Sequence, residues 1–251
     1  MKFIIKEESK MNEYIEIIKF LKNLTQYTTM MCTSEKIHIQ VLDDSHISLL
    51  DIHIPSEWFD GYHCEIPMTF SVNNNILTKL LNLYSKGSIM ETEIDDEKYN
   101  LSYLNNQENK YFCIGLVDIE KELLSPVIND TDLDFSLKTS LLDTYLNDLS
   151  IFGDDLEIKY NNDTLYFITS GDEGQNKIQI SYDSCIDFSV VDDYEFECKY
   201  SAKYLHYIAK LKKNYKYIHL YLDENNPLHI TFDNDTGIKI DYFIAPKISD
   251  D

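Results

Sequence analysis

The sequence predicts an α+β protein with two similar domains of antiparallel sheets, each with two short helices on one face. Three observations indicate this fold class. Polar and apolar residues alternate along many short segments, as in antiparallel strands that bury one face. Four other segments have apolar residues at the spacing of amphipathic helices. The expected order is the same in both halves of the chain: helix, several strands, helix, several strands.

The expected strands alternate with short polar turns. The clearest alternation of polar and apolar residues occurs in segments 36–42, 46–54, 177–182, 217–222 and 237–243. Asp, Asn, Gly and Pro, which favour turns, gather between strands at 42–45, 161–163, 170–174, 223–227 and 233–237. The pattern therefore predicts sheets rich in hairpins.

The four expected helices cover segments 12–24, 73–86, 138–151 and 200–213. In the first of these, Tyr14, Ile17, Ile18 and Leu21 stand at positions i, i+3, i+4 and i+7. The other three segments repeat this spacing closely. Each helix should therefore rest an apolar face on a sheet.

A connector is expected between the two halves, because segment 118–134 has no clear period, contains a proline and is acidic. The predicted organisation is an N-terminal domain at 1–117, this connector, and a C-terminal domain at 135–251. Some connector residues are apolar and need a covering surface, either a partner's or that of their own domain. These residues are Leu123, Leu124, Val127 and Ile128.

The charge of the chain is strongly negative but unevenly distributed. The formal net charge is −22, and all 22 basic residues are lysine. The four expected helices together carry +5, so the remainder carries −27. An evenly acidic protein would repel nucleic acid, whereas basic helices on an acidic body favour binding to phosphates without reading base sequence.

Lysines and amides form stripes along the expected helices. Lys203, His206, Lys210 and Lys213 stand at i, i+3, i+7 and i+10. The same pattern, or a shorter version of it, is found in two other helices, at Asn75, Lys79, Asn82 and Lys86, and at Lys19 and Lys22. An ordinary solvated helix face would look similar, so it is the difference in sign from the rest of the chain that favours a phosphate-binding surface.

Membrane and secreted classes are disfavoured. No apolar run approaches the ~18–20 residues of a membrane span, and the N-terminus lacks the apolar region of a signal peptide. We expect a soluble intracellular protein. The five cysteines form no C-x-x-C pair, so neither a zinc site nor a disulfide is expected, and all five should be buried. They are Cys32, Cys64, Cys113, Cys185 and Cys198.

An enzyme is also disfavoured. Pairs of acidic residues such as Asp43-Asp44 and Asp172-Glu173 lie in or beside turns, where Asp is favoured for local reasons. The chain has no G-x-S-x-G or H-E-x-x-H motif and no glycine-rich phosphate loop. We therefore expect no catalytic residue, no metal and no cofactor.

Several segments resemble one known family. The most specific are Leu42-Asp43-Asp44-Ser45-His46-Ile47-Ser48-Leu49, Ser56-Glu57-Trp58-Phe59-Asp60-Gly61-Tyr62-His63-Cys64 and Phe243-Ile244-Ala245-Pro246-Lys247-Ile248, with shorter pieces at 148–150, 170–172 and 227–228. Together they resemble the proliferating cell nuclear antigen family, the DNA polymerase sliding clamps of eukaryotes, archaea and large DNA viruses. The resemblance implies the DNA clamp fold, with two domains per subunit and three subunits closing into a ring whose hole is lined by helices.

The resemblance implies that lysines on the helices face double-stranded DNA. Lys22, Lys79, Lys203 and Lys210 match basic residues of the family that face DNA, and the stripes add Lys19, Lys86 and Lys213. Asn82, Thr144 and Asn147 stand where the family commonly has further basic residues. Contact with DNA is therefore expected to be weaker here.

The resemblance also implies a groove beneath the connector that docks DNA polymerase, the clamp loader and other proteins with the docking motif. Its residues would be Leu42, His46, Ile47, Leu49, Pro227, Phe243, Ala245 and Pro246, with Leu123 and Pro126 as a wall. His46 is expected to be a groove or turn histidine and not a catalyst.

Subunits of the family join edge to edge, and the resemblance implies edge strands at 111–117 and 177–182. The expected interface residues are Tyr111, Cys113, Ile114, Leu116, Lys177, Ile178, Ile180 and Tyr182. A homotrimer is the first expectation. A subunit of a hetero-trimeric checkpoint-type clamp and a monomeric processivity factor are the alternatives. The lack of arginine suggests an AT-rich genome. The expected location is the nucleus, or a viral replication factory if the protein is viral.

Overall fold

The structure is a computed structural model that describes residues 1–119, 123–126, 131–233 and 235–247. The chain divides into two compact units, Met1–Ser125 with Asp235–Ile240, and Pro126–Asn234 with Asp241–Asp251. The predicted α+β class is confirmed, because each unit combines antiparallel sheets with two α-helices among its described residues. None of the described helices has the length and apolar character needed to cross a membrane.

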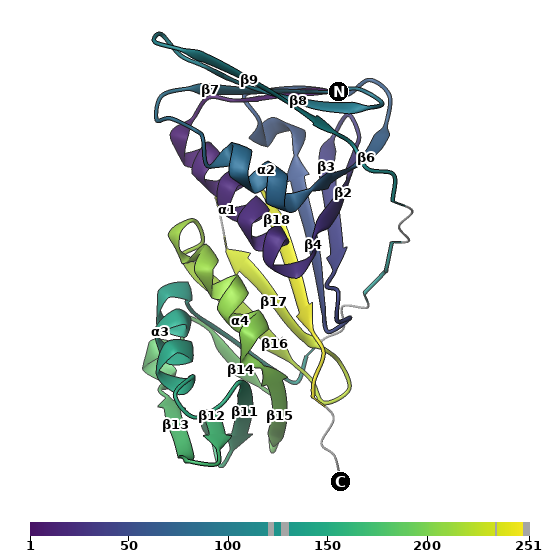
Figure 1. Ribbon diagram of the computed structural model, residues 1–251. Coiled ribbons are helices and arrows are strands. Elements are labelled where there is room, and N and C mark those ends of the chain that lie inside the picture. Colours follow the sequence, from purple (N-terminus) through teal and green to yellow (C-terminus); the bar gives the residue numbers. More distant parts are fainter. Residues whose placement is uncertain (120–122, 127–130, 234, 248–251) are drawn as a thin grey trace. The chain divides into compact units, whose positions relative to one another are not determined.

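The first unit contains two antiparallel sheets and two helices. One sheet has the strand order β5-β1-β7-β8-β9, and the other contains β4, β3, β2 and β6 in that order. The elements are β1 Lys2–Ile5, α1 Glu8–Leu24, β2 Tyr27–Cys32, β3 Lys36–Leu42, β4 Ser48–Pro55, η1 Ser56–Trp58, β5 Gly61–His63, β6 Met68–Asn73, α2 Asn74–Leu81, β7 Ile89–Ile94, β8 Lys98–Leu104 and β9 Asn109–Gly115. Helices α1 and α2 lie side by side and pack against each other (Figure 1).

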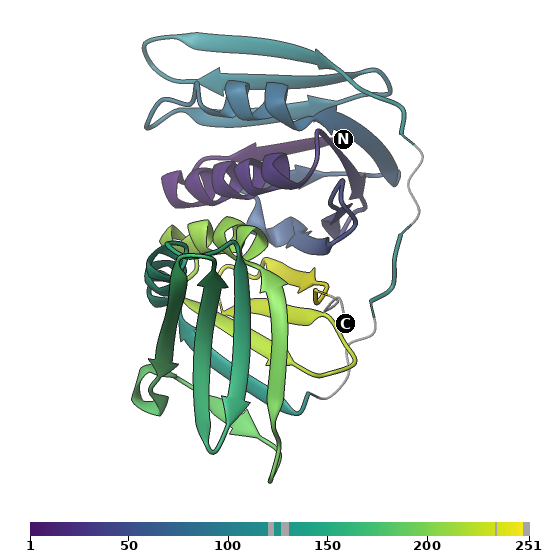
Figure 2. The same ribbon diagram turned by 60° about the horizontal axis from the view of Figure 1, so that its bottom comes forward.

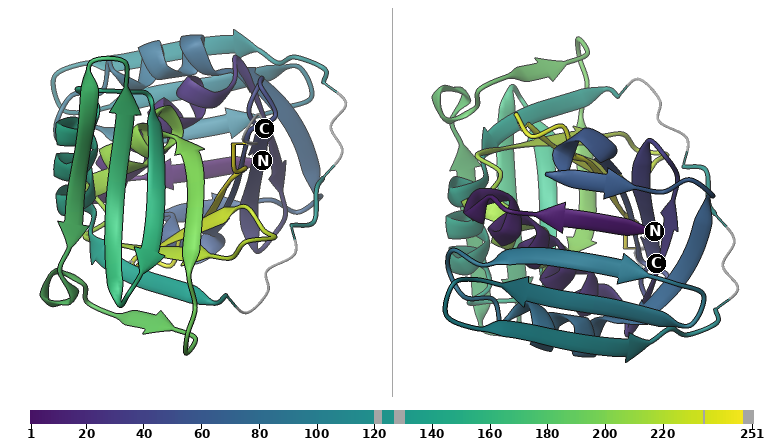
Figure 3. Two further views of the ribbon diagram at one scale, coloured as in Figure 1. Left: turned by 90° about the horizontal axis from the view of Figure 1, so that it is seen from below. Right: turned by 90° about the horizontal axis from the view of Figure 1, so that it is seen from above.

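The second unit repeats this plan. One sheet has the order β13-β12-β11-β15, and the other contains β14, β10, β16, β17 and β18. The elements are β10 Leu133–Lys138, α3 Thr139–Leu149, β11 Asp155–Asn161, β12 Thr164–Gly171, β13 Gly174–Ile180, η2 Tyr182–Ser184, β14 Phe188–Val190, β15 Phe196–Ser201, α4 Ala202–Ala209, η3 Lys210–Lys213, β16 Tyr217–Leu222, β17 Leu228–Asp233 and β18 Lys239–Ile244. Figure 2 shows the four-stranded sheet face on, and Figure 3 shows α3 and α4 behind it.

Helix α1 begins at Glu8, four residues before its predicted start at residue 12. The carboxylate of Asp60 accepts hydrogen bonds from the backbone N–H groups of Lys6 (2.5 Å) and Glu7 (3.3 Å). It also lies 3.0 Å from the Lys10 ammonium. A carboxylate from a distant loop therefore fixes the backbone just before the helix, where its negative charge suits the helix N-terminus.

Helix α2 is shorter than predicted. Asn73 caps its N-terminus, because its side chain accepts hydrogen bonds from the N–H groups of Asn75 and Ile76. The helix ends at Leu81, so Lys86 lies in the following turn and not on the predicted stripe. Gly87 follows with a φ of 83°, which favours glycine and is incompatible with a continuing helix.

Two predictions about edge strands need correction. Strand β9 ends at Gly115, and Leu116 lies beyond it, with its N–H donating to the carbonyl of Glu97 at 2.9 Å. Strand β13 ends at Ile180, and Tyr182 begins the 3₁₀ helix η2. The hydroxyl of Tyr182 donates a hydrogen bond to the backbone carbonyl of Asp163.

The prediction that all five cysteines are buried is wrong for three of them. Cys32 and Cys64 are buried, Cys185 and Cys198 are partly exposed, and Cys113 is exposed. Cys113 points from an edge strand whose burial alternates, so its face of β9 is open to solvent.

Candidate nucleic-acid and partner-binding surfaces

Helices α1 and α2 turn their apolar faces inward and leave lysines outside. Leu21 of α1 and Leu77 of α2 are fully buried, whereas Lys22 and Lys79 are exposed. Neither lysine forms an ion pair with any residue that the structure describes. Their charges are therefore available to an anion in solution.

Two other predicted DNA-facing lysines are already paired. The Lys19 ammonium lies 2.9 Å from the carboxylate of Glu16 on the same helix. The Lys86 ammonium lies 3.1 Å from Glu8, at the start of α1. Both pairs are partly exposed, so they are weak and a phosphate could compete for either lysine.

Lys203 and Lys210 share one aromatic ring in the second unit. Their ammonium groups lie 5.7 and 5.4 Å from the centre of the Tyr207 ring, one turn before and one turn after it. The ring face attracts both cations, so it holds the two like charges on one side of α4 and η3. Lys213 is exposed and forms no ion pair with a described residue.

His206 adds no positive charge to the predicted stripe near neutral pH. Burial lowers the pKa of His206, and Lys210 lowers it further, although Asp143 acts in the opposite direction. Asp143 also pairs with Lys212, so Lys212 is not one of the lysines without an ion pair. The stripe therefore presents three free lysines.

Helix α3 offers amides and hydroxyls in place of lysines. The Thr144 hydroxyl donates to the carbonyl of Ser140 at 3.0 Å, and the Asn147 amide donates to the carbonyl of Asp143 at 2.7 Å. These exposed side chains turn back onto their own helix. The structure therefore agrees with the expectation that α3 contributes little positive charge.

The turn between β3 and β4 is held by one buried carboxylate. Asp43 accepts hydrogen bonds from the N–H groups of Ser45 (3.0 Å), Ile47 (2.8 Å) and Ser48 (2.6 Å). His46 takes a φ of 58° and is exposed, so it is a turn histidine. The turn places Ile47 outward with 36% of its surface exposed.

Gln40 fixes the described part of the connector onto the first unit. Its side-chain oxygen accepts the N–H of Leu124 at 2.7 Å, and its amide nitrogen donates to the carbonyl of Leu124 at 2.8 Å. The side chains of Leu123 and Leu124 stay 50% and 46% exposed. Both side chains are therefore open to solvent. The apolar connector residues Val127 and Ile128 lie outside the described residues.

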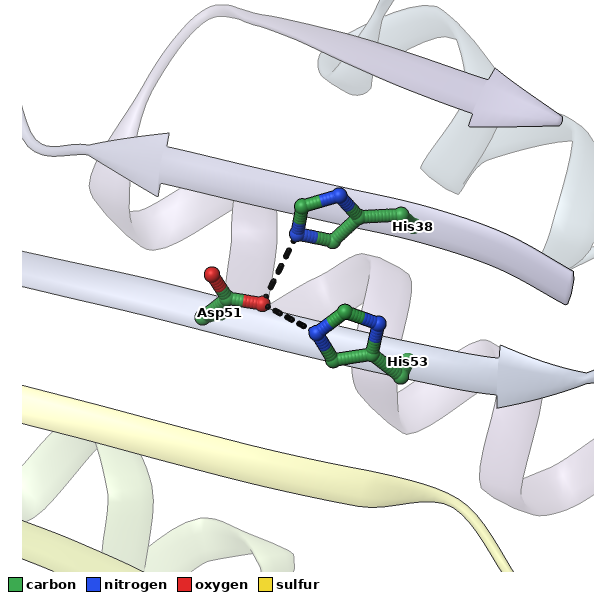
Figure 4. Close-up of side chains that lie close together, drawn as sticks. All are labelled: His38, Asp51 and His53. Carbon is green, nitrogen blue, oxygen red and sulfur yellow. Dashed lines mark hydrogen bonds and ion pairs between the residues drawn. The ribbon is translucent and has the colours of Figure 1, made fainter. Parts of the chain in front are cut away.

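The carboxylate of Asp51 orients Gln40 and holds two histidines. It accepts a hydrogen bond from Gln40 at 2.7 Å on one oxygen, while the other lies 2.9 Å from His38 and 3.0 Å from His53 (Figure 4). Burial raises the pKa of Asp51, but the hydrogen bonds from His38, His53 and Gln40 outweigh it and hold the pKa well below its usual range. Asp51 is therefore ionised at neutral pH.

Sequence reasoning did not anticipate this cluster or the role of Gln40. Side chains of one strand alternate between faces, so residues 38, 40 and 42 share one face of β3, and residues 49, 51 and 53 share the matching face of β4. Extending the hairpin pairing outward from the turn at 43–47 would have placed them opposite one another. The partly exposed Leu42 and Leu49 lie at the turn end of this face.

The predicted groove residues of the second unit differ in exposure. Pro227 and Pro246 are exposed, Ala245 is partly buried, and Pro126 is partly buried. Phe243 is only 6% exposed and stacks on His229, with ring centres 4.5 Å apart. Phe243 is therefore covered within its own unit.

Strands β9 and β13 each lie at the edge of their sheet. Tyr111 on β9 is 69% exposed, and the Lys177 ammonium on β13 lies 3.5 Å from the centre of the Tyr166 ring. Ile114 of β9 and Ile180 of β13 are buried in their own units, and Ile178 is partly buried. On its outer side, neither strand pairs with another described strand, so each leaves a row of backbone groups for docking.

Two family models match consecutive parts of the chain. The model for the N-terminal domain of proliferating cell nuclear antigen matches residues 8–124, and the model for its C-terminal domain matches residues 128–247.

Curated proteins are similar over almost the whole length. "Proliferating cell nuclear antigen 2" of Drosophila melanogaster is 23% identical over 239 residues, 94% of each chain. "DNA polymerase sliding clamp 1" of Sulfolobus acidocaldarius is 26% identical over 92% of this chain and 97% of its own. "Probable DNA polymerase sliding clamp 2" of Paramecium bursaria Chlorella virus 1 is 24% identical over 91% of this chain and 85% of its own.

A solved structure is similar in fold. The crystal structure of proliferating cell nuclear antigen from Thermococcus kodakaraensis superposes with a TM-score of 0.88, covers 98% of this chain and 99% of its own, and is 15% identical. The arrangement of sheets and helices is therefore the same in both.

Proposed function

Because this chain belongs to the proliferating cell nuclear antigen family, we propose that it is a DNA polymerase sliding clamp that closes into a ring around duplex DNA. The observation that carries this proposal is the match of both family domains, in order, over residues 8–124 and 128–247. A clamp performs no bond chemistry, and its effect is to keep a polymerase near its template. We therefore assign no catalytic residue.

The DNA-binding surface we propose consists of lysines on or next to the helices. Lys22, Lys79, Lys203, Lys210 and Lys213 are exposed and form no ion pair with a described residue, and Lys19 and Lys86 supplement them through weaker, paired positions. Contacts of this kind neutralise phosphates without reading bases, so binding is independent of sequence and sensitive to salt. The acidic remainder of the chain disfavours DNA elsewhere.

For the assembly we propose a homotrimer joined by the edge strands β9 and β13. The support is that both strands lie at sheet edges in their own units, with Tyr111, Cys113 and Lys177 exposed. Backbone pairing between such edges would continue one sheet into the next subunit. A heterotrimer would instead use the edges of a second chain.

For the partners we propose DNA polymerase, a clamp loader and other proteins that carry an apolar and aromatic docking peptide. Ile47, Leu123 and Leu124 support this proposal, because they are exposed apolar side chains held by the Asp43 turn and by Gln40. Exposed apolar groups on a fixed backbone suit a peptide-docking surface. The location we propose is the nucleus, or a viral replication factory if the protein is viral.

The experiment that tests the proposal compares retention on circular and linear DNA. The purified chain is loaded with a cognate clamp loader onto nicked circular duplex, and the template is then cut once. A ring stays on the circle at moderate salt and slides off after the cut, while native mass measurement gives three chains per particle.

Equal retention before and after the cut would reject encirclement. A particle of one chain that still stimulates polymerase would favour the monomeric processivity factor. A requirement for a second chain would favour the hetero-trimeric clamp.

A further inference from the structure

We propose that His38, Asp51 and His53 bind one zinc ion on the β3–β4 hairpin. The pairing of the two strands brings the residues together. His38 lies directly opposite His53, and Asp51 precedes His53 by two residues on the same face of β4. The two imidazole rings stack with centres 4.3 Å apart and an angle of 7° between their planes.

The three side chains converge on one point (Figure 4). The Nε2 atoms of His38 and His53 lie 2.9 and 3.0 Å from the same Oδ1 atom of Asp51, and the ligand atoms all lie within 4.8 Å of one another. Zn²⁺ bonds of about 2.0–2.2 Å in a tetrahedral site require ligand atoms roughly 3.3 Å apart. The nitrogens therefore need to move only a few tenths of an ångström from Oδ1, while the two stacked rings must rotate so that both Nε2 atoms face one ion and no two ligand atoms stay as far as 4.8 Å apart.

The ligands stand on a rigid support. Paired strands hold all three backbones, and Gln40 donates a hydrogen bond to Oδ2 of Asp51 at 2.7 Å. This bond orients the carboxylate and leaves Oδ1 for a metal, as outer hydrogen bonds do in known metal sites. Gln40 is fixed in turn by its two hydrogen bonds to Leu124.

Lys36 opposes metal binding and so lowers the affinity for zinc. Its ammonium lies 2.9 Å from Nδ1 of His53, so Nδ1 accepts a hydrogen bond and the ring proton is on Nε2, where it points at Asp51. Zinc needs the Nε2 lone pair, so the proton must move to Nδ1 and Lys36 must turn away. Lys36 is partly exposed at the start of β3 and has room to do so.

The set of ligands favours a transition-metal ion. Two imidazoles and one carboxylate suit Zn²⁺, and also Fe²⁺, Cu²⁺ or Ni²⁺, whereas Mg²⁺ and Ca²⁺ prefer sites made only of oxygen. The side chains of His38, Asp51 and His53 are 17%, 12% and 29% exposed, so solvent can supply a fourth ligand.

Isothermal titration of the full chain with ZnCl₂ tests the proposal. We expect one ion per chain, and we expect His38→Gln or His53→Gln to weaken binding by about a hundredfold or more. Gln40→Ala should weaken it by roughly 10–100-fold, the usual effect of losing an outer hydrogen bond. His63→Gln is the matched control, because His63 lies 3.3 Å from Glu65 and belongs to no cluster of this kind.

The variant Lys36→Met distinguishes a real metal site from an effect of misfolding. Removing the ammonium frees Nδ1 of His53, so zinc should bind more tightly than in the wild type, a gain that a misfolded protein would not give. Bound Co²⁺ should show the visible bands of nitrogen and oxygen ligands without a thiolate charge-transfer band. Absence of saturable binding, affinity unchanged in both histidine variants, or a thiolate band would overturn the proposal.

Discussion

Single side chains decide where the elements of this protein begin and which charges stay free. Asp60, in the loop before β5, accepts hydrogen bonds from the N–H groups of Lys6 and Glu7 and so fixes the backbone that leads into α1. The ammonium groups of Lys203 and Lys210 both lie close to the centre of the Tyr207 ring, at 5.7 and 5.4 Å. The first contact joins residues far apart in the sequence, whereas the second joins neighbouring turns and follows from local spacing.

Asp60→Asn should lower the stability of the first unit by about 1 kcal/mol, the usual effect of losing a negative charge at a helix N-terminus. Burial raises the pKa of Asp60, but hydrogen bonds from Lys6, Lys10 and Glu7 outweigh it, so the pKa lies below its usual value. The stabilisation is therefore present above pH ~4 and is lost as the pH falls through the folded pKa.

Thermal unfolding of Asp60→Asn and the wild type from pH 7 down to pH 2 measures this effect. The gap between their midpoints should close below pH ~4. Asp96→Asn is the control, because Asp96 is exposed and accepts no hydrogen bond from a described residue. A gap that persists at pH 2 would show that Asp60 acts through something other than its charge.

Lys79, Lys203 and Lys210 together should carry much of the attraction to DNA. Replacing all three with alanine should shorten retention on DNA at low salt. It should also reduce the slope of log affinity against log salt by about 1 for each lysine that contacts a phosphate. The measurement is a salt titration of retention on nicked circular DNA.

The control replaces Lys2, Lys159 and Lys199, which have the same charge but pair with carboxylates on strands. This variant should keep the slope of the wild type. Equal slopes for the two triple variants would mean that net charge, and not the helix surface, governs binding.

At the scale of elements, the β3–β4 hairpin combines several tasks. Its turn is fixed by Asp43 and exposes Ile47, and its outer face holds Leu124 through Gln40. The hairpin therefore positions both apolar parts of the proposed docking surface in the first unit.

Gln40→Ala should free the connector at Leu124 without unfolding the hairpin. Faster hydrogen exchange of the Leu124 amide, which Gln40 now accepts at 2.7 Å, is the direct readout. Affinity for a docking peptide should fall by up to about 30-fold, since two hydrogen bonds of about 1 kcal/mol each no longer order the loop. Gln107→Ala, in an exposed turn, should change neither quantity.

Element boundaries were predictable where the side-chain pattern decides them. Strands β3 and β16 have the predicted bounds, 36–42 and 217–222, because strict alternation continues to their ends. The start of α1 and the end of α2 were not predictable, because hydrogen bonds to Asp60 and a turn ending at Gly87 fix the backbone there.

In the candidate site too, the local sequence predicts some features, whereas contacts between distant residues decide others. Amphipathic spacing was enough to predict that Lys22 and Lys79 are exposed. That Lys86 pairs with Glu8, or that Gln40 holds the connector across 84 residues of sequence, depends on tertiary contacts. The His38 cluster was missed for a related reason: its three members come together only through the strand register.

At the scale of the whole molecule, the edge strands β9 and β13 determine whether the proposed ring can close. Tyr111→Glu combined with Cys113→Glu should place acidic groups on an edge that must approach another subunit. We expect native mass to fall from three chains to one, and stimulation of the polymerase to fall with it. Ile66→Glu, at a residue that is 79% exposed between β5 and β6, is the control and should leave the trimer intact.

The exposed thiol of Cys113 would let the wild-type chain report when the proposed ring opens. Burial raises the pKa of the Cys185 and Cys198 thiols, which slows their alkylation, while Cys32 and Cys64 are inaccessible. A maleimide pulse should therefore modify Cys113 when the ring is open and spare it when the ring is shut. Loading could then be followed in real time on the wild-type protein. A mass spectrum would give the number of subunits whose Cys113 has been modified.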